Sequence, residues 1–211
     1  TQNQAFSAVL FLYKNVLGTP LGWVDQFERA RRPRRLPVVL TRPEVECLLG
    51  ALRERHWLMA GLLYGAGLRL LECVRLRVKD IDFGYKQIVV RSGKGNKDRV
   101  TLLPEALIEP MRGHLASVKT LHERDLAAGY GCAPLPGALV RKYPQAEKFW
   151  GWQFVFPSSK RSVDRSDGVI RRFYTSPKTL QKAIHEAVRV SGLAKPASCH
   201  SLRHTFATHL L

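Results

Sequence analysis

The spacing of apolar residues along the chain predicts a mostly helical protein. Thr41 stands three residues before Glu44 in the pattern of a capping box, and apolar residues at helical spacing follow it. The segment His56 to Ala66 is apolar nearly all round, which is expected of a buried central helix. Further helices are predicted over residues 1–17, 69–78 and 107–126, after Ser176, and from His200.

Strands are predicted at fewer places. Two β-rich runs, Gln87 to Arg91 and Arg99 to Leu103, flank a glycine- and lysine-rich segment and indicate an antiparallel hairpin. Short strands are also expected at Gln153 to Phe156 and at Val169 to Tyr174. The predicted fold is therefore mainly α with a small antiparallel β-sheet, an α+β architecture.

Composition adds a strong positive charge to this helical chain. Its 211 residues include 34 lysines and arginines against 17 acidic residues, a formal net charge of +17. Such an excess disfavours the compact state unless a polyanion is a normal partner, and nucleic acid is the first candidate. An anionic membrane is the second candidate, but the apolar, charge-free run Trp57 to Leu68 is shorter than the roughly 20 residues of a membrane span.

The cysteines bear on the cellular compartment. The four cysteines are scattered, with no paired spacing, so we expect free thiols in a reducing, cytoplasmic compartment rather than a disulfide or zinc framework.

Part of the positive charge is concentrated in residues 27–39. Arginines punctuated by prolines make a poor helix and a good extended linker. Such a run is either merely solvated or in contact with phosphates, and the charge of the whole chain makes the second interpretation as strong as the first. The candidate DNA contacts in this linker are Arg31, Arg32, Arg34 and Arg35.

Three features could together form an anion-binding site. His200 and Arg203 lie three apart near the start of a predicted helix, an end that already attracts anions. Arg69 follows a glycine-rich break in the most apolar helix, where an arginine is costly unless it pairs with Glu72 or holds an anion. Lys94 stands between two glycines at the predicted hairpin tip. Each has a simpler interpretation as well: a surface histidine and arginine, a structural ion pair, or a solvated lysine.

Taken together, these features resemble the catalytic domain of the tyrosine recombinases. The resemblance rests on Gly-Leu-Arg69-Leu-Leu-Glu72, on the lysine-tipped hairpin that ends Gly93-Lys-Gly-Asn-Lys-Asp-Arg99, and on His200-x-x-Arg203. It extends over roughly Leu40 to Leu211. A further stretch, which includes Trp150 to Ser159, resembles the extra segment of integron integrases.

The resemblance implies a division of the chain. Residues 1–26 would be a remnant of the family's helical core-binding domain, and residues 27–39 would be a basic interdomain linker. Residues 40–211 would be the catalytic domain, incomplete at its C-terminus, with an integron-integrase-type insertion over residues 129–175.

The resemblance also implies site-specific recombination and integration of gene cassettes, with no metal or other cofactor. In this family a tyrosine attacks a DNA phosphate and forms a 3′-phosphotyrosyl intermediate. Arg69 and Arg203 would bind the phosphate, His200 would take a proton or donate a hydrogen bond, Lys94 would protonate the leaving 5′-oxygen, and Glu72 would orient the arginine. The implied partners are duplex DNA and sites folded from one strand, with a homo-tetramer on DNA and a monomer as the alternative for these residues alone.

The sequence departs from the family pattern at its end. Members of the family continue past the His-x-x-Arg helix to another histidine or tryptophan and then to the nucleophilic tyrosine. Here the sequence ends at Leu211, and all 6 tyrosines precede His200. We therefore expect these residues to bind DNA but not to cleave it.

Two aromatic and basic clusters are further candidates for DNA contact. Recognition of an extrahelical base calls for an aromatic platform, and stacking contributes about 1–3 kcal/mol per base. Trp150 and Trp152 would share one face of the expected strand, where they could stack on a base or equally pack into the core. Arg171 and Arg172, beside two aromatic residues, form the second cluster.

Two other classes of protein compete with this interpretation. A metal-dependent hydrolase could use His200, His204, His209 and Cys199, but Ser201 stands where a zinc protease has its glutamate, and Arg203 would repel a cation. A non-catalytic DNA-binding regulator explains the charge, but not the assembled set of site residues.

Overall fold

The computed structural model describes residues 2–19, 36–91, 98–136, 139–143 and 145–211. The chain divides into two compact units, Thr1–Leu36 and Pro37–Leu211. In the first unit, helix α1 (Gln2–Phe11) continues into a π-helical turn, Leu12–Val16, and none of the described residues of these two elements is buried. The apolar residues predicted for this helix therefore form no buried core among the described residues of the unit.

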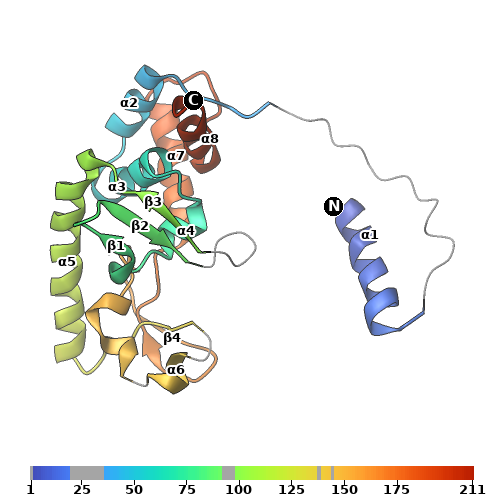
Figure 1. Ribbon diagram of the computed structural model, residues 1–211, viewed down its shortest axis with the longest axis vertical. Coiled ribbons are helices and arrows are strands. Elements are labelled where there is room, and N and C mark those ends of the chain that lie inside the picture. Colours follow the sequence, from blue (N-terminus) through green and yellow to red (C-terminus); the bar gives the residue numbers. More distant parts are fainter. Residues whose placement is uncertain (1, 20–35, 92–97, 137–138, 144) are drawn as a thin grey trace. The chain divides into compact units, whose positions relative to one another are not determined.

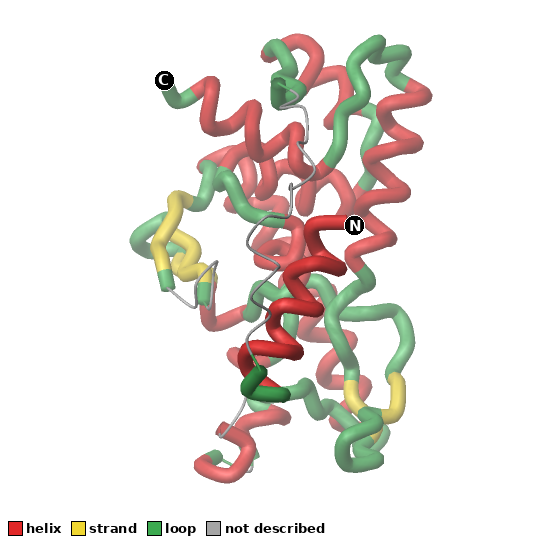
Figure 2. The backbone as a smooth tube through the Cα atoms, turned by 90° about the vertical axis from the view of Figure 1, so that its right-hand side faces the viewer, coloured by secondary structure: helices red, strands yellow, loops and turns green. Residues whose placement is uncertain are grey.

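The second unit is mainly helical, as Figures 1 and 2 show. Its helices are α2 (Arg42–Gly50), α3 (Glu54–Gly65), α4 (Leu70–Val74), α5 (Ile108–Ala127), α6 (Leu139–Lys142), α7 (Pro177–Val190) and α8 (Cys199–His209). One antiparallel sheet has the order β1 (Ile81–Asp82), β2 (Gln87–Val90) and β3 (Arg99–Leu102), and a separate pair consists of β4 (Ser162–Val163) and β5 (Ile170–Arg171). The predicted fold class, mainly α with a small antiparallel sheet, is confirmed.

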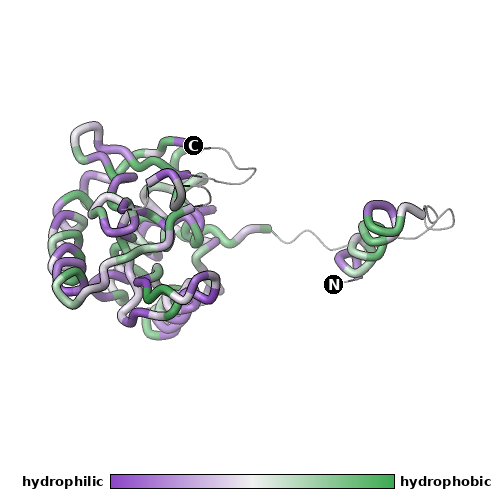
Figure 3. The backbone as a smooth tube through the Cα atoms, turned by 90° about the horizontal axis from the view of Figure 1, so that it is seen from below, coloured by the Kyte–Doolittle hydropathy of each residue, from purple (hydrophilic) through white to green (hydrophobic). Residues whose placement is uncertain are grey.

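Helix α3 is the centre of the second unit. Six consecutive residues of it, Leu58 to Leu63, are buried, and the helix contacts α2, α4, α5, α7 and α8. Helix α2 begins with the predicted capping box, in which Thr41 N donates to Glu44 Oε2 (2.7 Å) and Glu44 N donates to Thr41 Oγ1 (3.4 Å). In Figure 3, apolar and polar residues are interleaved along the helices of this unit. Within the described part of the chain, no helix combines the length and apolar character that crossing a membrane requires.

The break after α3 depends on Gly67. Its φ of +61° is a left-handed conformation that favours glycine, and a Cβ built on it would lie 2.4 Å from the ring of Phe206 in α8. The chain can therefore turn tightly out of α3 while α8 packs against the turn. This turn places Arg69 directly before α4.

The structure differs from the sequence-based prediction at three elements. The helix predicted over 69–78 ends at Val74, and Arg77 instead forms an isolated β-bridge with Phe154. The strand expected at Gln153–Phe156 is reduced to that bridge. The last strand shortens to Ile170–Arg171. Residues Phe154 to Phe156 are all buried, so the apolar run reflects burial on every side rather than pairing in a sheet.

Candidate active site

A buried carboxylate, Glu72, organises the predicted site. Its side chain is only 8% exposed. Arg69 N donates to Glu72 Oε2 and Arg69 Nη1 donates to Oε1, each at 2.7 Å. Arg99, the first residue of β3, donates from Nη1 to Oε1 (2.8 Å) and from Nη2 to Oε2 (2.7 Å). Arg203 Nη1 lies 3.8 Å from Oε2. We call Arg69, Arg99 and Arg203 the arginine cluster.

The electrostatics follow from this arrangement. Burial alone would raise the pKa of Glu72, but hydrogen bonds from Arg99 and from the backbone and side chain of Arg69 lower this pKa to about 2. The same carboxylate raises the pKa of Arg99. Burial, together with the charge of Arg69, lowers the pKa of Arg203. With Glu72 ionised, three guanidinium groups surround one carboxylate, which leaves the group with two positive charges in excess.

Helix α8 supplies His200 and Arg203. Ser198 caps the helix by accepting a hydrogen bond from Ser201 N, and the fully buried Leu202 fixes the opposite face in the core. Arg203 donates from Nη1 to the carbonyl oxygen of Gly67. The turn after α3 therefore orients both arginines. The backbone carbonyl of Gly67 accepts the hydrogen bond from Arg203, and the turn places Arg69 directly before α4.

Arg69, His200 and Arg203 line one open cleft of about 660 Å³. The sequence analysis placed these three residues together, and the structure brings them to the same cleft from α4 and α8. The polar side chains of α7 at the cleft are Gln181 and His185. The apolar part of the lining consists of Leu68, Leu70, Leu71, Pro177, Ile184 and Ala197. Guanidinium and imidazole groups that converge on an apolar cleft are suited to bind an anion.

Other predicted site residues fall outside the part of the chain that the structure describes. These are Lys94 in the hairpin and the linker residues Arg31, Arg32, Arg34 and Arg35. The hairpin itself is confirmed, since β2 and β3 pair antiparallel with Val90 opposite Arg99.

Sequence reasoning missed the position of Arg99. It closes the glycine- and lysine-rich motif and was treated only as part of the flanking pattern. The contact with Glu72 depends on how the hairpin packs against α4, and no local spacing encodes that packing. The one available signal was an arginine at the start of a predicted strand, and its partner Glu72 lies 27 residues earlier in the chain.

Trp150 and Trp152 do not share a strand face, so that prediction is wrong. They belong to a 3₁₀ turn, Trp150–Trp152. Trp150 is partly buried and packs against the core. Trp152 has the Lys79 Nζ 3.8 Å from its ring centroid, and its backbone carbonyl accepts a hydrogen bond from Arg77 Nη1. A cation therefore already lies over the ring of Trp152.

Arg171 is also placed differently from the prediction. Its side chain is only 5% exposed and forms ion pairs with Glu147 (3.1 Å), Asp164 (3.3 Å) and Asp167 (2.6 Å). These carboxylates raise the pKa of Arg171, with the hydrogen bond to Asp167 as the largest cause. A guanidinium so enclosed stabilises the segment 129–175 and is not presented to DNA.

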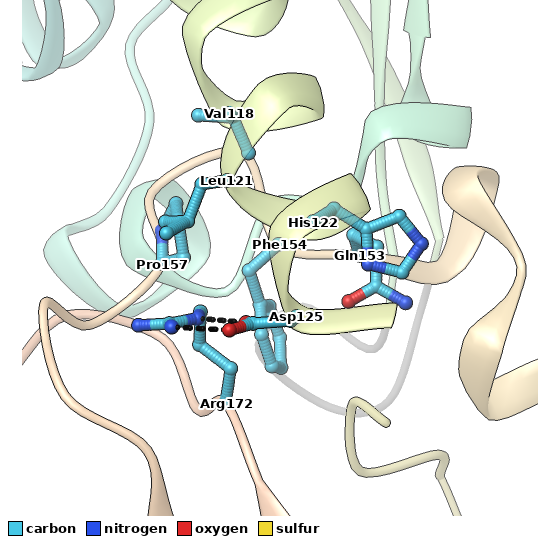
Figure 4. A pocket seen from close by; sticks show the side chains of 8 residues that line it. All are labelled: Val118, Leu121, His122, Asp125, Gln153, Phe154, Pro157 and Arg172. Atoms are coloured by element: carbon cyan, nitrogen blue, oxygen red, sulfur yellow. Dashed lines mark hydrogen bonds and ion pairs between the residues drawn. The ribbon is translucent and has the colours of Figure 1, made fainter. Parts of the chain in front are cut away.

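The guanidinium of Arg172 is also paired with a carboxylate inside the protein. It donates from Nε to Asp125 Oδ2 (2.5 Å) and from Nη2 to Asp125 Oδ1 (2.8 Å), a two-pronged contact with the end of α5. Figure 4 shows the two side chains facing each other beside Phe154 and Pro157. Both oxygens of the buried Asp125 are thereby satisfied, so the predicted DNA contact of Arg172 is corrected to an internal one.

Metal ligation is not favoured by the arrangement of side chains. Among the described residues, no three His, Cys, Asp or Glu side chains are grouped so that they could hold a metal ion. His200 and His204 lie with their rings stacked at 5.9 Å between centroids. The arginine cluster adds positive charge beside them.

The fold and the cleft define a mainly helical protein in which two arginines and a histidine converge on one cleft. The model of the phage integrase family matches residues 38–211, and the chain therefore belongs to this family, the tyrosine recombinases. An "Integrase/recombinase" of Escherichia coli is 47% identical over 211 residues, which are 100% of this chain and 63% of that protein. The chain thus spans about 63% of the length of this curated relative.

Solved structures of tyrosine recombinases have the same fold. The crystal structure of XerA recombinase has a TM-score of 0.56 and 25% sequence identity, over 99% of this chain and 61% of XerA. The XerH site-specific recombinase bound to its difH substrate has a TM-score of 0.58 and 21% identity, over 100% of this chain and 54% of XerH.

Proposed function

We propose that this chain binds and activates the scissile phosphate in a site-specific DNA recombinase. The observation that carries the proposal is the convergence of Arg69, His200 and Arg203 on one cleft, with both arginines oriented from behind by Glu72 and Gly67. Each guanidinium can donate two hydrogen bonds to phosphate oxygens. Family membership supports the same reaction class.

Charge supports a role in the chemical step as well as in binding. A DNA phosphodiester carries one negative charge, and the pentavalent species formed during attack carries an additional one. The surplus of two positive charges around Glu72 matches the pentavalent species better than the ground state. Stabilisation that is stronger in the transition state is what accelerates a reaction.

The proposed step forms a bond from a tyrosine oxygen to phosphorus and breaks the bond from phosphorus to the 5′-oxygen. His200 accepts the tyrosine proton or donates a hydrogen bond to the phosphate, and Lys94 gives a proton to the leaving 5′-oxygen. No tyrosine of this sequence follows His200. We propose that the 211 residues alone bind DNA, and that cleavage needs a tyrosine from outside them.

The more specific proposal is recombination of integron cassettes in the bacterial cytoplasm, by a tetramer on sites folded from one DNA strand. It rests on the resemblance of residues 129–175 to the integron-integrase segment. An ion pair between Arg171 and Glu147 lies within this segment, and Arg172 joins the segment to Asp125 of α5. Comparing covalent complex formation on a folded single-stranded site with that on the matching duplex tests this proposal. A preference for the duplex would contradict it.

The general proposal is tested with the full-length protein and a nicked suicide substrate, which traps the covalent intermediate. We expect a protein–DNA adduct that is lost in Arg69→Ala and Arg203→Ala variants that still bind DNA. If a well-folded full-length protein binds the DNA without forming an adduct, the non-catalytic regulator is the better description.

A further inference from the structure

Arg99 belongs to the arginine cluster but not to the cleft. The described residues that line the cleft include Arg69, His200 and Arg203, whereas Arg99 reaches Glu72 from the first position of β3. Its guanidinium occupies both carboxylate oxygens, each at less than 3 Å. Arg99 therefore contacts Glu72, which in turn contacts Arg69 and Arg203.

The geometry of Glu72 shows what Arg99 contributes. Arg69 also uses both oxygens, one through its backbone and one through its side chain. Because the Arg99 fork is planar and bidentate, it fixes the plane of the carboxylate. Arg203 then remains 3.8 Å from Oε2, close enough for attraction but without a direct hydrogen bond.

We propose that Arg99 is a positioning residue of the phosphate site. By occupying Glu72 it prevents the carboxylate from drawing in Arg203, and it holds Arg69 and Arg203 apart at the spacing needed to bind one phosphate between them. The identification of that phosphate as a DNA phosphate rests on the proposed function.

The charge balance gives a second reason for Arg99. Without it, Glu72 would neutralise a larger share of Arg69 and Arg203, the two arginines that line the cleft. With it, the carboxylate is already paired from behind, and both arginines keep more of their charge for an anion. Loss of Arg99 should therefore weaken anion binding even though no contact with the anion is removed.

The chain offers a matched control on the other strand of the same hairpin. Arg91, just after β2, donates from Nε to the buried Asp80 at 2.7 Å. This pair resembles the Arg99–Glu72 pair, since each joins a partly exposed arginine of the hairpin to a carboxylate less than 10% exposed. Asp80 is not among the residues that line the cleft. Arg91→Gln therefore loosens the hairpin without changing the partner of Arg69 and Arg203.

The first experiment measures binding of inorganic phosphate to this chain by NMR, through the imidazole Cε1–H resonance of His200. We expect Arg99→Gln to weaken phosphate binding about tenfold, because Arg69 and Arg203 are then less well oriented and more strongly neutralised by Glu72. Arg91→Gln should bind like the parent chain, Arg99→Lys should fall between them, and Arg69→Gln sets the non-specific level. Equal affinity in Arg99→Gln and Arg91→Gln would overturn the proposal.

The second experiment measures single-turnover cleavage by the full-length protein. Arg99→Gln should lower the rate constant of adduct formation at saturating protein, with little change in the half-saturating concentration, because the other DNA contacts remain. On a substrate whose scissile phosphate is a methylphosphonate, one non-bridging charge is absent, and the rate defect of Arg99→Gln should shrink. A defect of the same size on both substrates would indicate general misfolding and contradict a positioning role.

The two experiments separate the two ideas. If the parent full-length protein forms no adduct, the proposed recombinase chemistry fails, while the phosphate titration still decides the role of Arg99. If the parent forms the adduct and Arg99→Gln matches it in both measurements, the role of Arg99 fails and the recombinase chemistry stands.

Discussion

Replacing Gly67 by alanine tests whether the turn after α3 holds the site together. The φ of +61° puts an alanine there in the left-handed region, at a cost of about 1–2 kcal/mol. The new Cβ would lie 2.4 and 2.5 Å from two ring carbons of Phe206. Relieving such an overlap in a packed region costs about 1–3 kcal/mol. We therefore expect Gly67→Ala to lower the free energy of unfolding by about 2–5 kcal/mol.

Gly192→Ala is the matched control for this prediction. Gly192 has nearly the same φ, +67°, but nothing lies within 4 Å of its added Cβ. Both variants restrict the unfolded chain alike, so the difference between them isolates the contact with Phe206. Urea unfolding measures the free energies of unfolding of both variants, provided that the slope of this free energy against urea concentration is the same as in the parent chain.

A double variant makes the test sharper. If the clash with Phe206 dominates, Phe206→Leu should cost less in the Gly67→Ala background than in the parent chain, with a coupling of about 1 kcal/mol. Gly67→Ala should also weaken phosphate binding, because the carbonyl that accepts from Arg203 moves. Equal destabilisation by Gly67→Ala and Gly192→Ala, with no coupling to Phe206, would refute the described packing.

Three further predictions follow from the ion pairs and the charge. The pKa of Glu72 is lowered from 4.5 to about 2, so its ionised form stabilises the fold fully above pH 4.5, and this contribution is lost as the pH falls toward 2. In urea unfolding, the free energy of unfolding of Glu72→Gln should therefore decrease less between pH 4.5 and pH 2 than that of the parent chain. Arg77→Ala removes hydrogen bonds to the carbonyls of Trp152 and Pro134 and a stacking contact with Phe154. It should therefore lower the free energy of unfolding by about 3 kcal/mol. Limited digestion should show faster proteolysis within residues 129–175. Affinity for duplex DNA should fall steeply with added salt in a fluorescence anisotropy titration, and a flat response would contradict phosphate contact.

Features encoded locally could be predicted from the sequence. The cap at Thr41, the buried α3 and the β2–β3 hairpin each depend on neighbouring residues, and each is confirmed. The joint position of Arg69, His200 and Arg203 was anticipated from their resemblance to a known pattern rather than from spacing.

Features decided by tertiary pairing could not be predicted. Alternation around Trp150 and Trp152 indicated a strand, but these residues form a 3₁₀ turn that precedes the buried residues Phe154 to Phe156, and a short apolar run does not distinguish these structures. Arg171 and Arg172 looked like a basic surface because each has an acidic partner far away in sequence, Glu147 being 24 residues from Arg171 and Asp125 47 residues from Arg172. Arg99 was missed for the same reason.

The energetics of Glu72 indicate that the arginine cluster serves to bind an anion rather than to stabilise the fold. A buried ion pair is often no more stable than well-packed apolar residues, because desolvation offsets the attraction. Three arginines around one buried carboxylate are less favourable still, since the guanidinium groups repel one another, and Arg69 and Arg99 both act to lower the pKa of Arg203. An anion in the cleft removes that repulsion. If this is the role of the cluster, inorganic phosphate should stabilise the parent chain against urea more than it stabilises Arg203→Gln, and an equal effect on both would mean that the cluster serves the fold alone.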